Sequence, residues 1–153
     1  MGTATKLIDD VAELDPREAA KRLAESQEHR AGWLDAFTEH LDRRRSGQSL
    51  ARTLNVWDLN QSEAARLFGV TRQALSKWLA QGVPAERADV IADLAAATDL
   101  LVHYLKRDRI PGVVRRSIAT IDDRSLIDLL EAGDSQSMLR ICREMFSFDR
   151  AQS

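Results

Sequence analysis

The stretch QSEAARLFGVTRQALSKWL, residues 61–79, decides the fold. It holds two short segments with apolar residues at helical spacing, and Gly69 separates them. Gly69 supplies the positive φ that a tight turn requires, and Ala65, four residues earlier, is small enough for two helices to touch. Thr71 is a favoured residue for the N-cap of the second helix. The spacing therefore predicts a helix–turn–helix unit.

The second helix of this unit has one apolar side and one polar side. Leu75 and Trp78 mark the inward side. The outward side carries side chains suited to base edges and phosphates: Thr71, Arg72, Gln73, Ser76 and Lys77. We expect Arg72 and Gln73 to contact bases, because arginine can bind guanine, and glutamine adenine, through two hydrogen bonds.

Phosphate contacts are expected around this helix. Gln61 lies in the first turn of the preceding helix, where its side chain and the helix N-terminus can bind a phosphate together. Arg66, Thr71 and the arginines at 43–45 are candidates for the same role.

Charge is unevenly distributed along the chain. The net charge is −2, but residues 43–82 carry 7 basic and 2 acidic side chains, a local charge of +5. Residues 1–42 sum to −5 and residues 83–153 to −2. A local basic island favours a phosphate-facing surface. On charge alone, a solvated helix end at 43–45 is an alternative interpretation.

The rest of the chain predicts further helices. Residues 16–45 have the pattern of one long amphipathic helix that begins after the N-cap Asp15 and ends at Ser46-Gly47. A second long helix is predicted from Pro84 to about Lys106, and Pro111-Gly112 then interrupts the chain. Short helices are predicted over residues 113–117, 124–131 and 135–146. The prediction is all-α, with an N-terminal helical segment (1–46), a helix–turn–helix domain (47–83) and a C-terminal helical domain (84–153).

Several functional classes are disfavoured. Cys142 is alone and His29, His40 and His103 are scattered, so neither a disulfide nor a metal site is expected. The common nucleotide-binding and hydrolase motifs are absent, and we expect neither enzymatic activity nor a cofactor. No apolar run approaches the roughly 20 residues of a membrane span, and the first residues lack the apolar run of a secretory signal. We therefore expect a cytoplasmic protein with no membrane partner.

The stretch from Leu50 to Pro84 resembles the Xre, or lambda-repressor-like, helix-turn-helix domain, and NQSEAARLFGVTRQALSKWL carries the resemblance. This resemblance implies a DNA-binding protein with double-stranded DNA as its partner. It also implies a homodimer, because such units usually bind two half-sites as a pair.

Residues 107–146 resemble the toxin-binding domain of Xre/MbcA/ParS-type antitoxins. The resemblance rests on Ile110-Pro111, on Arg124, Ser125, Leu126, Leu129 and Gly133, and on a final helix from Met138 to Phe146. It implies a cognate toxin as partner, of the NAD-degrading or ADP-ribosyltransferase-like kind. The toxin contacts that it implies are Arg124, Leu126, Leu129, Met145, Phe146 and Phe148.

Three functional hypotheses follow. The first is an antitoxin that neutralises a toxin and represses its own operon. The second is a stand-alone repressor whose C-terminal part only dimerises. In the third, the helix–turn–helix unit is a protein-interaction scaffold without a role on DNA.

Overall fold

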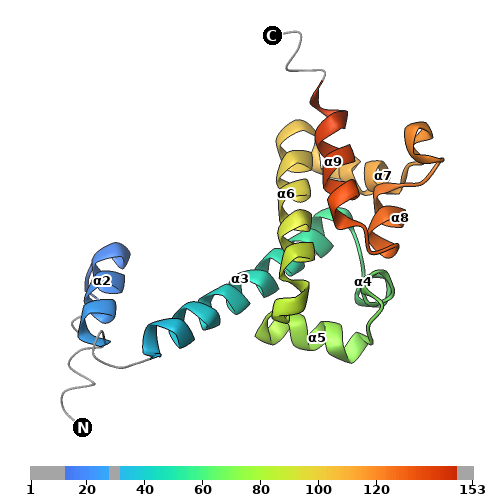
Figure 1. Ribbon diagram of the computed structural model, residues 1–153. Helices are drawn as coiled ribbons and strands as arrows, with labels where there is room; N and C mark the ends of the chain where they lie inside the picture. Colours follow the sequence, from blue (N-terminus) through green and yellow to red (C-terminus); the bar gives the residue numbers. More distant parts are fainter. Residues whose placement is uncertain (1–12, 28–31, 148–153) are drawn as a thin grey trace. The chain divides into compact units, whose positions relative to one another are not determined.

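The computed structural model describes residues 13–27 and 32–147 and is all-α, as predicted (Figure 1). Within these ranges the only β contact is an isolated bridge between Ile118 and Arg124. The α-helices are α2 (Pro16–Gln27), α3 (Trp33–Trp57), α4 (Gln61–Phe68), α5 (Arg72–Gln81), α6 (Ala88–Tyr104), α7 (Ile110–Arg115), α8 (Leu126–Glu131) and α9 (Ser135–Met145). Three 3-10 turns join them: η1 (Ala85–Arg87), η2 (Arg107–Arg109) and η3 (Ala119–Ile121).

The chain divides into two compact units between Leu41 and Asp42. The second unit contains the C-terminal part of α3 and all helices from α4 to α9. The predicted domains 47–83 and 84–153 therefore lie in the same compact unit.

One hydrophobic core fills the second unit, and α6 and α9 pack closely along it. Its largest fully buried side chains include Leu50, Trp57, Leu75, Leu94, Leu101, Ile110, Leu126, Leu129 and Met138. A buried polar network joins α3 to α6. The Trp57 indole donates to Thr98 Oγ1 at 3.1 Å, and the Thr98 hydroxyl donates to Leu94 O at 2.7 Å. Because these polar groups are paired, the two helices can meet without an unsatisfied buried donor.

The N-terminal helix differs from the prediction at both ends. Residues 16–45 do not form one helix, because α2 ends at Gln27 and α3 begins at Trp33 after Gly32, whose φ is +80°. The prediction that a helix ends at Ser46-Gly47 is also wrong, since α3 continues to Trp57. Asp15 does lie at the start of α2, where its carboxylate accepts from Arg17 N at 3.1 Å.

Gly47 allows α3 to contact α5 closely and does not end the helix. A Cβ at this position would lie 3.0 Å from Trp78 O and 3.3 Å from Leu79 O, in the last turn of α5. The missing side chain lets the α3 backbone approach α5 closely. A helical glycine with this tertiary role cannot be distinguished from a helix stop by its neighbours in sequence.

Pro111 and Gly112 do not break the helical structure at this point, contrary to the prediction. They lie inside α7, which begins at Ile110. Proline is accommodated in a first helical turn because its missing N–H would have no intrahelical acceptor there. The short helix predicted over 113–117 is therefore shifted towards the N-terminus.

No helix in the described ranges is both long enough and apolar enough to cross a bilayer.

Candidate nucleic-acid interface and partner surface

The predicted turn between α4 and α5 is confirmed. Asn60 and Glu63 form a capping box at the start of α4: Asn60 Oδ1 accepts from Glu63 N at 2.9 Å, and Glu63 Oε2 accepts from Asn60 N at 3.0 Å. Gly69 ends α4 in the left-handed conformation, with φ 64°. Thr71 is the N-cap of α5, as predicted, and its Oγ1 accepts from Ala74 N at 3.0 Å. Local sequence signals thus place both helices and the turn.

The inner side of α5 is fixed by aromatic packing. Trp78 is 7% exposed, and its ring meets Phe68 edge to face at 5.9 Å between centroids. The Arg87 guanidinium lies 5.6 Å from the Trp78 ring centre and also donates to Phe68 O at 3.1 Å. These contacts hold α5 against α4 and η1. The expectation that Trp78 is a packing residue is confirmed.

The outer side of α5 is polar and free. Arg72, Gln73, Ser76 and Lys77 are exposed, and none of their side chains forms a hydrogen bond or ion pair with another residue in the described ranges. At about 100° per residue, these four positions cover one side of the helix. The Thr71 hydroxyl beside them caps α5 with its oxygen and keeps its hydrogen available for a further acceptor. The side is therefore equipped to donate hydrogen bonds to a ligand.

The two α4 residues have different surroundings. Gln61 is exposed in the first turn of α4, as expected. Arg66 is exposed as well, but it lines hollows of about 250 Å³ and 150 Å³ that α4 forms with α8. Asp128 and Arg115 line the first of these hollows, and Glu131 and Arg87 line the second, so groups of both charges surround Arg66.

The expected partner contacts fall into three groups. Leu126 and Leu129 are 0% and 1% exposed, so they offer no area to a partner, and their assignment to a partner surface is corrected to core packing. Arg124 is exposed, and its Nε donates to Ile121 O at 3.3 Å. Met145 is exposed and Phe146 is partly buried, while Phe148 lies outside the described residues.

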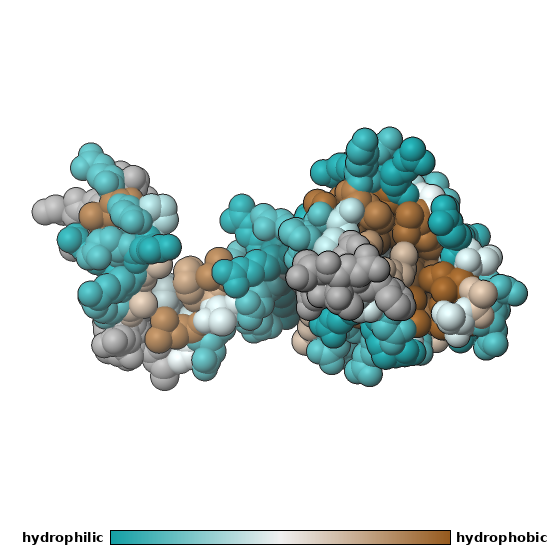
Figure 2. Space-filling view, turned by 90° about the horizontal axis from the view of Figure 1, so that it is seen from above, coloured by the Kyte–Doolittle hydropathy of each residue, from teal (hydrophilic) through white to brown (hydrophobic). Residues whose placement is uncertain are grey.

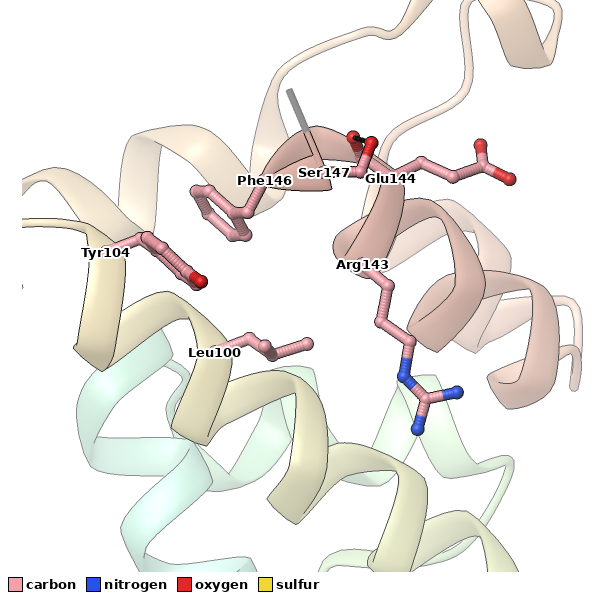
Figure 3. Close-up of a pocket in the computed structure, with 6 residues that line it drawn as sticks. All are labelled: Leu100, Tyr104, Arg143, Glu144, Phe146 and Ser147. Carbon is pink, nitrogen blue, oxygen red and sulfur yellow. Dashed lines mark hydrogen bonds between the residues drawn. The ribbon is translucent and has the colours of Figure 1, made fainter. Parts of the chain in front are cut away.

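A hollow of about 280 Å³ lies between the C-terminal ends of α6 and α9. Figure 3 shows the side chains that line it: Leu100, Tyr104, Arg143, Glu144, Phe146 and Ser147. The Tyr104 and Phe146 rings stack at 4.6 Å. Leu100 and Tyr104 were not predicted as site residues, although their spacing of four positions places them on one face of a helix.

Charge and apolar surface meet at this hollow. Glu144 is paired with Arg140 at 3.0 Å, whereas the Arg143 side chain has no hydrogen bond or ion pair within the described ranges. Met145, the last residue of α9, lies between the lining residues Glu144 and Phe146 in sequence and is 37% exposed. Figure 2, which looks down on this end of the second unit, shows apolar residues gathered there with hydrophilic residues around them. Such a surface has the composition of a protein-binding site.

The chemistry of the remaining groups is limited. In the part of the chain that the structure describes, no three His, Cys, Asp or Glu residues are grouped as metal ligands would be. The Cys142 thiol lies in the core and donates to Ala97 O at 3.7 Å. Burial raises the pKa of this thiol to about 11, with Arg143 opposing the shift. Cys142 is therefore protonated at neutral pH and is not a nucleophile.

Comparison with known proteins identifies a shared fold. No protein-family model and no curated protein matches the sequence. Among solved structures, the chain is similar to a chain in the crystal structure of the M. tuberculosis MbcT–MbcA toxin–antitoxin complex, with a TM-score of 0.53 and 20% identity. The similarity covers 65% of this chain and 91% of that chain. At this identity the likeness establishes the fold.

Proposed function

We propose that this protein is a DNA-binding antitoxin that neutralises a cognate toxin and represses its own operon. One observation carries the DNA-binding part: α5 exposes four polar side chains without intramolecular partners, on a helix whose other side is fixed by Trp78. A rigid helix with free donors on one side fits the major groove of DNA.

In this proposal α5 enters the major groove. Arg72 and Gln73 contact base edges, and Ser76 and Lys77 complete the contact with bases and phosphates. Gln61 binds a phosphate at the N-terminus of α4, where the capping box uses the N–H groups of Asn60 and Glu63 and leaves those of Gln61 and Ser62 for the phosphate.

The antitoxin part rests on the fold shared with a chain of a toxin–antitoxin complex. The hollow between α6 and α9, with exposed Met145 beside it, supplies a surface for the toxin. The protein is then a regulator and not an enzyme.

We further propose that the protein acts as a homodimer, which would allow two α5 helices to bind paired half-sites. Exposed apolar residues on α3 support pairing: Leu34, Phe37 and Leu41 lie at spacings of three and four and are 41%, 37% and 39% exposed.

Salt-dependent binding tests the DNA-binding part. Binding is measured to the fragment upstream of the protein's own gene and to random DNA of equal length. Arg72→Ala should lose about 1–3 kcal/mol on the upstream fragment and much less on random DNA. Lys77→Ala should weaken binding to both and lower the salt slope by about 0.9. Arg116→Ala, which removes an exposed positive charge elsewhere, is the control. Equal losses for all three variants would contradict the proposed interface.

Growth rescue tests the antitoxin part. The neighbouring gene is expressed alone and then together with this protein, and we expect it to arrest growth only when expressed alone. Met145→Asp, which places a charge on the apolar surface, should reduce the rescue, whereas Arg72→Ala should leave it intact. If expression of the neighbouring gene does not arrest growth and this protein still binds DNA, the result would instead favour the stand-alone repressor.

A further inference from the structure

The arginine run of α3 lies against the C-terminal end of α5. Gly47 approaches the carbonyls of Trp78 and Leu79, and a Cβ on Gly82 would clash with the Arg43 backbone. Ser46 adds a hydrogen-bonded link: its hydroxyl donates to Arg43 O at 2.7 Å and accepts from Val83 N at 2.9 Å. Residues 43–47 are therefore held in a fixed position relative to the last turn of α5.

Helix geometry separates two neighbouring arginines. Arg44 and Gly47 are three residues apart, about 60° around the helix, so Arg44 lies at the margin of the side of α3 that meets α5. Arg45 is two residues from Gly47, about 160° around the helix, and lies on the opposite side. Both side chains are exposed, and neither has a hydrogen bond or ion pair in the part of the chain that the structure describes. The two arginines thus project from different sides of α3, although both are charged and exposed.

The length of α5 matches the width of the major groove. Ten residues at about 1.5 Å each give a helix of roughly 15 Å. The major groove is about 12 Å wide, so a helix of this length lying in the groove can bring one of its ends close to a phosphate backbone. No residue of α5 is acidic, so no carboxylate on that helix competes with the phosphate for a nearby arginine.

We propose that Arg44 binds a backbone phosphate of the same duplex that α5 enters, and that Arg45 does not. Gly47 and Gly82 act as positioning residues, because their missing side chains allow α3 to meet the end of α5. The contact extends the interface beyond the helix–turn–helix unit. This inference rests on the proposed DNA binding.

The matched pair Arg44→Ala and Arg45→Ala tests the inference. Affinity for the upstream fragment and for random DNA is measured across a salt series, on the full chain, with helix content checked by circular dichroism. Arg44→Ala should weaken binding to both DNAs by roughly three- to tenfold and lower the salt slope by about 0.9. Arg45→Ala should change affinity less than about twofold. Arg44→Lys should restore most of the affinity, because a phosphate contact requires the charge and not the guanidinium.

The outcomes separate this inference from the function on which it rests. Equal effects of the two alanine variants would overturn the inference in favour of general charge attraction. If neither variant changes binding while Arg72→Ala and Lys77→Ala do, the inference fails and the DNA-binding proposal stands. If no variant changes binding, both fail.

Discussion

Two helical glycines in this protein have opposite relations to their surroundings. Gly47, in α3, is in close contact with backbone carbonyls of α5. Gly112, in α7, has open space where a side chain would point. The same residue type therefore has a packing role in one helix and none in the other.

Alanine substitutions at the two glycines should have opposite effects on stability. Gly112→Ala should raise the free energy of unfolding by about 0.5–1 kcal/mol, because alanine is the better helix former and its methyl group meets nothing. Gly47→Ala should lower it by about 1–3 kcal/mol, because the added Cβ forces α3 and α5 apart. Urea unfolding of both variants measures the difference. Changes of the same sign would mean that the close approach at Gly47 does not limit stability.

Single residues were predictable from sequence where their role is local. The φ of Gly69 and the cap at Thr71 depend on neighbours within four positions, and both are confirmed. The resemblance to an antitoxin domain implies toxin contacts at Leu126 and Leu129, but a sequence motif does not show which elements cover an apolar residue. In the fold, α4, α7 and α9 pack against α8 and bury both side chains.

Helices, like single residues, were predictable from sequence where nearby residues set their limits. Helices α4 and α5 match their predicted positions because a capping residue and a glycine delimit them. The extent of α3 was mispredicted, because the close approach of α5 that explains Gly47 is a contact between residues more than 30 positions apart. The hollow between α6 and α9 depends on how two separated helix ends meet, so its lining could be predicted only in part.

The reactivity of the Cys142 thiol reports whether α6 and α9 stay packed against each other. Its buried thiol has a pKa raised to about 11, so the folded protein should react slowly with a thiol reagent at pH 8, and unfolding in urea should release full reactivity. A folded pKa above the unfolded value contributes stability that is complete below about pH 9 and is lost as the pH rises towards 11. Cys142→Ser should remove the reactivity and serves as the blank. Rapid labelling of the folded protein at pH 8 would show that the two helices separate readily.

At the scale of the molecule, the buried hydrophobic residues of the described chain begin at Leu50 and end at Cys142. None belongs to the first compact unit. A fragment of residues 42–153 should therefore keep a cooperative thermal transition, followed by circular dichroism, with the full chain as reference. A broad, non-cooperative transition of the fragment would show that residues 1–41 contribute to the core.

The single core also shapes the outcome of a genetic selection. The proposed DNA-binding helix and toxin-binding hollow both depend on side chains such as Trp57 and Leu94, which are 0% and 1% exposed. In a cell that makes the toxin, a mutation that disrupts this core would abolish both operon repression and toxin neutralisation. The active toxin would then stop growth, so the mutant would not form a colony. Surviving derepressed alleles should therefore cluster at Arg72, Gln73, Ser76 and Lys77, so that the map of viable mutants outlines the exposed side of one helix.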